Sequence, residues 1–372
     1  MNKDSVIYVA GHTGLVGSAI TGILRSKGYN NLLLKTIDEL DLTDQAAVDH
    51  FFETEKPAYV FLAAARVGGI VANNTYRADF IYVNLMIQNN IIYASYKYGV
   101  KKLLFLGSTC IYPKNAPQPL KEDYLLTSEL EYTNEPYAIA KIAGLKMCES
   151  FNIQYGTNFI AVMPTNLYGT GDNYNLETSH VLPAILRKCH LGKCLEDNNM
   201  EAIRKDLDRY PVEKTDGQSD EKSILGILNK YGISTSTDEK GKMVTRVTLW
   251  GSGKPLREFM NSLDMAGACV FVMENTDVSD IIKIHSAHNS TAGYHPPHFI
   301  NIGTGEEVSI KELSDMIRKL TGFRGEVVFD AGKPDGTMRK VTDVRALSGL
   351  GYRHSISLEE GLKSVYNRYL QY

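Results

Sequence analysis

Short apolar runs alternate with amphipathic runs through the first half of the chain, and this alternation restricts the possible folds more than any other feature. Three apolar runs are nearly continuous, as in strands that are buried on both faces: 5–11, 58–65 and 101–108. The segments between them place apolar residues at helical spacing: 14–28, 43–56 and 78–99. Strands that alternate with helices are typical of βαβ units, so we predict an α/β protein with a parallel sheet.

Further elements fit the same pattern. A second strand is predicted at 31–36, and Thr43 is the predicted N-cap of the helix that follows it. The segment 134–156 predicts a long helix with Pro136 in its first turn, where the missing proline N–H has no partner to lose.

The domain organisation changes after Gly169, where the alternation loosens. We therefore predict a first domain at 1–170, to which later segments return, and a smaller α/β domain at 171–372. Residues 195–246 turn polar and charged, and they are predicted to form a partly helical surface insertion.

Composition excludes several classes of function. The 372 residues include 40 Lys+Arg and 43 Asp+Glu, so there is no basic excess to attract nucleic acid or an anionic membrane. Five irregularly spaced cysteines indicate a reducing compartment, and we expect a cytoplasmic protein without a leader or membrane-spanning run. Cys189, His190 and Cys194 lack a second matching pair, so we expect their spacing to be chance and predict no metal site.

Glycines at 11, 14 and 17 follow the first predicted strand and open the first predicted helix. A backbone that approaches a pyrophosphate and donates to it from a helix N-terminus needs residues without Cβ at these positions. A tight strand-to-helix turn would also use glycine. At the first strand of a βαβ series, however, the pattern favours dinucleotide binding by a doubly wound sheet of Rossmann type.

The choice between NAD and NADP depends on the loop after the second strand. No acidic residue stands directly at that strand end to hold a ribose 2′-hydroxyl. Lys35 could face a 2′-phosphate or could equally be a solvated strand-end lysine, and Asp41 and Leu42 are placed better beside the adenine. We expect NADP(H).

Three residues predict redox chemistry on a carbonyl or an alcohol. Tyr137 and Lys141 are spaced i, i+4 on the long helix and therefore project from one face. Because a tyrosine has a reference pKa of about 10, it needs a nearby ammonium to act as an acid near neutral pH, and Lys141 is expected to lower it. Ser108, at the end of the preceding strand, could donate to a substrate oxygen.

Eight blocks of the sequence resemble the GDP-L-fucose synthases, a family of extended short-chain dehydrogenases/reductases. The resemblance covers nearly the whole chain apart from the insertion, and several blocks are specific to that family. They are GHTGLVGSAI (from Gly11), AAARVGGIVANNTYRADF (from Ala63), LGSTCIYPK (from Leu106), NEPYAIAKIAG (from Asn134), VMPTNLYG (from Val162), SHVLPAILRK (from Ser179), WGSGKPLREF (from Trp250) and KPDGTMRK (from Lys333).

The resemblance implies conversion of GDP-4-keto-6-deoxy-D-mannose to GDP-L-fucose, by epimerisation at C3 and C5 and then reduction at C4 by NADPH. Cys110 and His180 match the family's pair, with the thiol as base and the imidazole as acid. A buried packing cysteine and a surface histidine are the simpler interpretations of these two residues. Ser108 and Tyr137 would stabilise the enolate oxygen, and Tyr137 would protonate it during reduction.

The resemblance also implies two sets of binding residues. The cofactor set, beyond Lys35, Asp41 and Leu42, comprises Gly11, His12, Thr13, Gly14, Leu15, Val16, Gly17, Leu106, Gly107, Ser108, Lys141, Pro164, Thr165, Asn166, Leu167 and His180. The substrate set comprises Lys188, Trp250, Arg257, Lys333 and Asp335, in which cations suit a diphosphate and the tryptophan could pack on the ligand.

The chain departs from the family pattern at three positions. Thr13 and Ile37 stand where NADP-specific relatives often carry arginine, which weakens the case for recognition of a 2′-phosphate. Thr109 stands where the family often has serine.

Two other classes of function remain open at this point. A nucleotide-sugar 4-epimerase or 4,6-dehydratase would share the fold, but a dehydratase normally carries an Asp-Glu pair where this chain has Thr109 and Cys110. A regulatory protein without activity tends to lose the serine, tyrosine or lysine, all of which are present here. The resemblance further implies a homodimer, formed through the long helices that start near Ala78 and Asn134.

Overall fold

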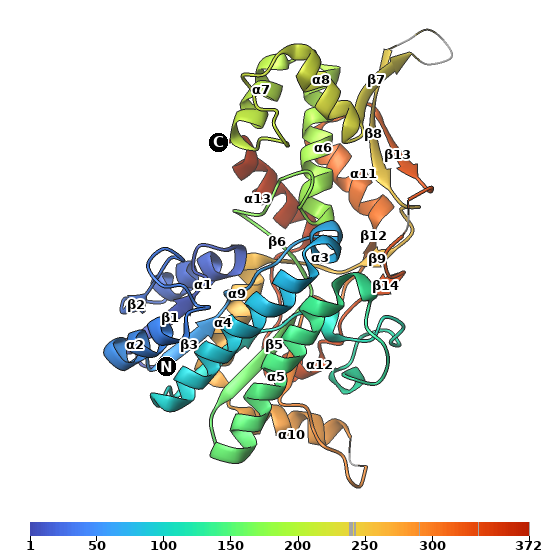
Figure 1. Cartoon of the computed structure of the whole chain (residues 1–372). Coiled ribbons are helices and arrows are strands. Elements are labelled where there is room, and N and C mark those ends of the chain that lie inside the picture. Colours follow the sequence, from blue (N-terminus) through green and yellow to red (C-terminus); the bar gives the residue numbers. More distant parts are fainter. Residues whose placement is uncertain (238–240, 242, 290, 334, 372) are drawn as a thin grey trace. The chain divides into compact units, whose positions relative to one another are not determined.

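The computed structural model describes residues 1–237, 241, 243–289, 291–333 and 335–371 (Figure 1). The chain divides into two compact units. The first unit consists of Met1–Gly171, Glu258–Glu306 and Lys340–Ile356, and the second of Asp172–Arg257, Glu307–Arg339 and Ser357–Tyr372. Each unit therefore contains segments that are far apart in the sequence.

A six-stranded sheet forms the centre of the first unit, and all its neighbouring strands are parallel. Its order is β2-β1-β3-β4-β5-β11, with the strands at Leu32–Leu33, Ile7–Ala10, Tyr59–Leu62, Lys102–Leu106, Phe159–Pro164 and Phe299–Ile302. The order reverses at β1, because β2 lies on one side of it and β3 on the other. Ligands of doubly wound sheets bind at such a reversal, beyond the carboxyl ends of the strands. The predicted fold class is confirmed.

Helices cover both faces of this sheet. Successive side chains along a strand point to opposite faces, so each strand contributes apolar side chains to both faces. In β1, Ile7 and Val9 belong to one apolar cluster and Tyr8 and Ala10 to another. The first cluster includes buried residues of α1 (Leu15–Ser26) and α9 (Ser262–Asn275), and the second those of α2 (Gln45–Glu55), α4 (Arg77–Lys97) and α5 (Glu135–Tyr155). The remaining elements of this unit are α3 (Ile70–Thr75), the 3₁₀ turns η1 (Thr109–Ile111), η2 (Glu122–Tyr124) and η3 (Tyr132–Asn134), β6 (Asn166–Tyr168), β10 (Phe259–Asn261), α10 (Val278–His288) and α12 (Arg345–Gly349).

Two local predictions need correction. The cap of α2 is Asp44, whose carboxylate accepts from the amides of Ala46 and Ala47, whereas Thr43 donates to Asp41. A carboxylate one position nearer the helix therefore replaces the predicted threonine cap. The second strand pairs with β1 over Leu32–Leu33 only, less than the predicted 31–36. Pro136 lies in the first turn of α5, as predicted.

The second unit contains a three-stranded sheet with helices. β8 (Met243–Trp250) pairs antiparallel with β7 (Ile233–Thr237) and parallel with β13 (Glu326–Asp330). Its helices are α6 (Val181–Glu196), α7 (Met200–Arg209), α8 (Glu221–Lys230), α11 (Ile310–Thr321) and α13 (Leu358–Leu370). Short strands lie at β9 (Leu256–Arg257), β12 (Val308–Ser309) and β14 (Arg339–Lys340). No helix in the described part of the chain is both long and apolar enough to span a membrane.

The segment predicted as an insertion, 195–246, supplies α7, α8, β7 and the start of β8. Its positions 238–240 and 242 lie outside the described residues. Ile203, Leu207 and Ile224 are fully buried in an apolar cluster that also includes Leu191 of α6. These side chains alternate with polar ones at helical spacing, so the segment contributes core to the second unit although its composition is polar.

Candidate active site

The glycine turn between β1 and α1 is built for a close backbone approach. Gly11 has φ +81°, and a Cβ added there would lie 2.7 Å from the backbone nitrogen of Ala64, just beyond β3. A Cβ on Gly17 would lie 2.0 Å from the carbonyl oxygen of Gly11. Gly14 is the N-cap of α1 and offers no side chain to the amides of the first turn. The turn and the helix N-terminus therefore fit a pyrophosphate at the reversal of strand order.

The loop after β2 holds the residues predicted to face the adenosine half of a dinucleotide. Lys35 is half-buried, and Asp41 is exposed. The Asp41 carboxylate accepts from the amide and the hydroxyl of Thr43, both at 2.8 Å, and these hydrogen bonds, the amide's first, lower the pKa of Asp41. The carbonyl of Leu42 accepts from the Asn90 side chain at 2.9 Å. This loop is thus fixed by its own hydrogen bonds and by α4.

The carboxyl end of β4 leads directly into Ser108 and Cys110. The hydroxyl oxygen of Ser108 accepts from the Cys110 amide at 3.3 Å and caps the turn η1. The Cys110 side chain is buried, and burial raises the pKa of its thiol. Several effects oppose that rise. The largest is the charge of Lys340, followed by a hydrogen bond with Ser108 and then by the charge of Lys141. Cys110 is therefore a thiol whose pKa burial raises and nearby positive charge partly restores.

Tyr137 and Lys141 lie on α5 next to the same strand end. The Lys141 ammonium donates to the carbonyl of Leu106 at 2.7 Å and lies 5.7 Å from the centre of the Tyr137 ring. Burial lowers the pKa of Lys141 to about 8, an effect that a negative charge on Cys110 opposes. Burial also raises the pKa of Tyr137, and the charge of Cys110 adds to this rise. The predicted lowering of the Tyr137 pKa by Lys141 is not found, because desolvation dominates and the ammonium is directed at Leu106.

The structure thus brings four predicted catalytic residues of the first unit together. Cys110 interacts electrostatically with both Tyr137 and Lys141, and Ser108 shares a hydrogen bond with Cys110. A hydroxyl, a thiol, a phenol and an ammonium are all groups that can donate or transfer protons. Their position at the carboxyl end of β4 is where a doubly wound sheet presents its ligands. This cluster is suited to proton transfer around one substrate oxygen.

The cofactor residues predicted beyond β5 continue the same edge of the sheet, because β5 pairs with β4. Pro164 ends β5, and the amide of Thr165 donates to the carbonyl of Ile302 at 3.0 Å. Asn166 donates from its side chain to the carbonyl of Glu258 at 2.9 Å and begins β6, which also contains Leu167. These hydrogen bonds hold the segment beside the strand ends.

Glu258 is a structural residue of this edge that sequence reasoning missed. It is fully buried, and its carboxylate accepts from the amides of Thr304, Gly305 and Thr342 and from the Thr342 hydroxyl. A buried carboxylate needs several such donors to offset its lost hydration. The available signal was an acidic residue directly before the buried strand β10.

His180 and the predicted substrate residues lie in the second unit. His180 is exposed and is the N-cap of α6. Lys188 donates to the carbonyl of Thr248 at 3.1 Å, and burial lowers the pKa of Lys188 to about 8. Thr248 belongs to β8, the strand that ends at Trp250, so Lys188 lies close to the carboxyl end of that strand.

The other substrate residues gather at the same end of β8. Trp250 is 63% exposed, and the Lys333 ammonium lies 5.4 Å from the centre of its ring. The Asp335 carboxylate accepts from the amide of Ser252 at 2.8 Å and from its hydroxyl at 2.7 Å. Burial lowers the pKa of Arg257, and the charge of Asp335 opposes this. An exposed aromatic ring with an ammonium over it can stack on a base, and the nearby cations can bind a diphosphate.

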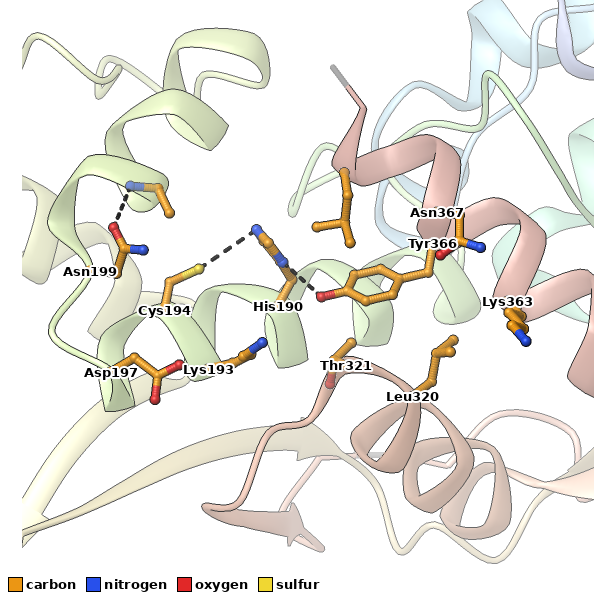
Figure 2. A pocket seen from close by; sticks show the side chains of 12 residues that line it. His190, Lys193, Cys194, Asp197, Asn199, Leu320, Thr321, Lys363, Tyr366 and Asn367 are labelled. Carbon is orange, nitrogen blue, oxygen red and sulfur yellow. Dashed lines mark hydrogen bonds between the residues drawn. The ribbon is translucent and has the colours of Figure 1, made fainter.

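A separate pocket of about 460 Å³ lies between α6, α11 and α13 (Figure 2). Figure 2 shows His190 between Cys194 and Tyr366, with Nδ1 3.1 Å from the Tyr366 hydroxyl and Nε2 3.7 Å from the Cys194 sulfur. None of the predicted site residues lines this pocket. Within the described residues, no group of three or more His, Cys, Asp and Glu side chains is placed to hold a metal ion.

Comparison with known proteins agrees with this geometry. GDP-L-fucose synthase 1 of Arabidopsis thaliana is 46% identical over 370 residues, which cover 100% of this chain and 94% of the relative. GDP-L-fucose synthase of Escherichia coli K12 is 46% identical over 373 residues, with coverage of 100% and 98%. The solved GDP-6-OMe-4-keto-L-xylo-heptose reductase of Campylobacter jejuni is 45% identical, with a TM-score of 0.89 and coverage of 100% and 99%.

A second solved structure, a GDP-D-glycero-L-gluco-heptose synthase from Campylobacter jejuni, is 44% identical with a TM-score of 0.87, and it covers 100% of this chain and 99% of that one. The resemblance found in the sequence blocks is confirmed by these relatives. The model of the NAD dependent epimerase/dehydratase family matches residues 7–207 and 230–284, and this chain belongs to that family.

Proposed function

We propose that this protein is a GDP-L-fucose synthase, which converts GDP-4-keto-6-deoxy-D-mannose to GDP-L-fucose with NADPH. The observation that carries the proposal is the cluster of Ser108, Cys110, Tyr137 and Lys141 at the carboxyl end of β4. A plain reductase needs the serine, tyrosine and lysine but has no use for a buried thiol among them. The 46% identity to proteins named GDP-L-fucose synthase over the whole chain supports the same reaction.

Epimerisation at C3 and C5 follows from the ketone at C4. Both carbons flank the carbonyl, so loss of a proton from either one gives an enolate. The thiolate form of Cys110 takes the proton and becomes the thiol, and the protonated imidazole of His180 gives a proton to the opposite face of the carbon. Ser108 and Tyr137 stabilise the enolate oxygen by donating hydrogen bonds to it. Since burial raises the pKa of the Cys110 thiol, the base depends on the positive charges of Lys340 and Lys141.

Reduction at C4 uses the same oxygen. When bound, NADPH supplies the hydride. Tyr137 donates the proton to the C4 oxygen, and we assign stabilisation of the resulting phenolate to Lys141, the ammonium 5.7 Å from the ring centre, although burial outweighs this charge before the substrate binds. The cofactor's pyrophosphate is assigned to the glycine turn at Gly11, Gly14 and Gly17, and the 2′-phosphate to Lys35. One solved relative is described in the presence of NADPH and another with NADP bound, which supports the choice of cofactor.

The nucleotide-sugar is assigned to the second unit. Trp250 and Lys333 offer a stacking surface with a positive charge, and Lys188 and Arg257 provide cations for the diphosphate. Asp335 is already satisfied by Ser252, so we assign it to shaping the loop that carries Lys333.

A second candidate is reduction of a GDP-4-keto-heptose. The relatives named for GDP-heptose chemistry are 44–45% identical, about as similar to this chain as those named for GDP-L-fucose. The two reactions share the keto group, the cofactor and the nucleotide, and they differ in the sugar's length. The UDP-glucose 4-epimerases found among solved structures are 20% identical or less and support the fold alone.

The test is incubation of the purified protein with each GDP-4-keto-sugar and with NADPH or NADH, followed by identification of the product. The proposal expects stoichiometric oxidation of NADPH and formation of GDP-L-fucose from the 6-deoxy-hexose. Faster turnover of the heptose would favour the second candidate. Turnover without added cofactor would indicate a 4-epimerase and contradict both.

We also propose a cytoplasmic homodimer. All five cysteines are free and buried, which suits a reducing compartment. Helices α4 and α5 pack against each other and leave large apolar side chains exposed, namely Tyr82, Tyr93, Ile139, Ile153 and Tyr155. Such a surface is typical of a face that a second copy covers.

A further inference from the structure

Arg187 of α6 is a fully buried guanidinium in the second unit, where it makes several short hydrogen bonds and also lies over the ring of Tyr210, 5.4 Å from its centre. Its Nε donates to Asp206 at 2.9 Å, and its Nη2 lies 2.7 Å from the same carboxylate oxygen. Nη1 donates to the carbonyl of Tyr174 at 3.0 Å, and Nη2 donates to the carbonyl of Tyr210 at 2.5 Å. A buried charge of this kind is tolerated only with such complete pairing, so the geometry around it is tightly determined.

The other side of this ion pair is formed by two distant segments. Asp206 and Tyr210 belong to the predicted insertion, and the hydroxyl of Tyr369 in α13 donates to Asp206. The ring of Tyr174 packs on those of Tyr369 and Tyr210, with centres 4.7 and 5.4 Å apart. Tyr174 is therefore held by its carbonyl and by its ring. We call Tyr174, Arg187, Asp206, Tyr210 and Tyr369 the tyrosine brace.

Tyr174 lies six residues before His180, and the chain between these two residues is a closed turn. The side chain of Asn175 accepts from the amide of Thr178 at 3.2 Å, and the carbonyl of Asn175 accepts from the amide of Ser179 at 2.9 Å. His180 follows at once as the N-cap of α6, the helix that also carries Arg187. Because hydrogen bonds link Asn175 to residues 177–179, we expect a shift of Tyr174 to move the backbone that carries His180.

We propose that the tyrosine brace positions His180 for epimerisation, and that this is the role of the insertion's α7. The inference rests on the proposed function, in which His180 returns the proton to C3 and C5. Arg187 and Asp206 act through His180 and are positioning residues. Displacement of a reacting group by about 1 Å can cost roughly 100-fold in rate. Reduction at C4 depends on Tyr137 and Lys141, so the brace should affect it much less.

Two conservative variants test the brace. Arg187→Lys keeps the charge but loses the planar donor set, and Asp206→Asn keeps the shape but loses the charge. With the 4-keto-6-deoxy substrate and NADPH in deuterated water, we expect the ratio of C3/C5 exchange to C4 reduction to fall by roughly 10- to 100-fold. Tyr369→Phe removes only the hydroxyl that donates to Asp206 and should lower the same ratio by a smaller factor.

The matched control is Ile317→Ala, in a fully buried position of α11 outside the brace. It should lower thermal stability and leave the ratio unchanged. If exchange and reduction fall together in the brace variants as they do in this control, the brace is merely structural and the inference is wrong. All variants are compared at a temperature where circular dichroism shows them folded, and Tyr369→Phe and Asp206→Asn carry the test if Arg187→Lys does not fold.

A second readout needs no turnover and separates this inference from the proposed function. The imidazole NMR signals of His180, assigned with His180→Asn, should shift in Asp206→Asn and Tyr369→Phe but not in Ile317→Ala. Unshifted signals in both brace variants would overturn the inference even if the wild type forms GDP-L-fucose. A wild type that shows neither exchange nor reduction would overturn the proposed function, and shifted signals would still show that the brace positions His180.

Discussion

At the scale of single residues, burial decides the acid-base properties of the cluster. Burial raises the pKa of Tyr137 and the pKa of Cys110, and it lowers the pKa of Lys141 to about 8. Desolvation is the largest cause of each shift. The spacing of Tyr137 and Lys141 predicts their shared face correctly. It could not show that the ammonium donates to the carbonyl of Leu106, because that bond depends on how α5 packs on β4.

The pKa of Lys141 predicts a pH dependence for reduction. The folded value of about 8 lies below the unfolded value near 10.4, so the lysine loses its charge in the folded protein as the pH rises through about 8. Because only the charged form can offset the negative charge left on Tyr137, the rate of C4 reduction should be full well below pH 8, half at about pH 8, and fall by about tenfold per pH unit above it. The pH profile of kcat measures this, and a constant rate up to pH 9.5 would contradict it.

At the scale of elements, the glycine turn shows how a sequence pattern specifies geometry. The three glycines have different roles. Gly11 has a left-handed backbone conformation and lies against Ala64, and Gly17 allows α1 to pack on the Gly11 carbonyl. Gly14 is the N-cap of α1 and leaves the amides of the first turn uncovered. A Cβ on Gly14 would meet nothing nearer than 3.4 Å. The positions that exclude a side chain and the one that tolerates it can therefore be separated.

Gly17→Ala should weaken NADPH binding by more than about tenfold and lower the free energy of unfolding by about 1–3 kcal/mol, because its Cβ would overlap the Gly11 carbonyl. Gly14→Ala is the matched control and should change the free energy of unfolding by less than about 1 kcal/mol. Fluorescence titration with NADPH and urea unfolding provide the two measurements. Equal effects of the two substitutions would contradict the different roles assigned to these glycines.

Elements with a strong local signal were predictable, and those set by distant contacts were not. The parallel strands and the helix at Pro136 follow from periodicity and proline position. The cap at Asp44 instead of Thr43 differs by one residue, which is the usual uncertainty of a helix start. The partners of Glu258 lie 46 to 84 residues away in the chain, so no local pattern could reveal them.

At the scale of the whole molecule, the predicted site residues are distributed over both units. Ser108, Cys110, Tyr137 and Lys141 belong to the first, and His180 with the substrate residues to the second. The polar composition of 195–246 predicts a surface segment, yet Asp206 of this segment accepts from Tyr369, 163 residues later in the chain. Its role in the core depends on contacts that composition does not encode.

The exposed apolar face of α4 and α5 predicts the oligomeric state. Ile153 is 70% exposed, and Ile153→Asp places a charge where the proposed dimer would bury an apolar side chain. The dimer should weaken by at least about 100-fold, which corresponds to about 2.7 kcal/mol. Sedimentation velocity over a range of concentrations measures the change. Leu225→Asp, at an exposed position of α8, is the control that should remain dimeric, and a wild type that is monomeric throughout would contradict the proposal.

The central claim is that the thiol of Cys110 separates this enzyme from a plain reductase. Its most direct test is deuterium incorporation at C3 and C5 of the 4-keto sugar nucleotide in deuterated water, with wild type and Cys110→Ser compared. We predict that the substitution lowers exchange by roughly 100- to 10,000-fold, the range for loss of a general base, while C4 reduction persists. Undiminished exchange in Cys110→Ser would exclude the thiol as the base and contradict the account.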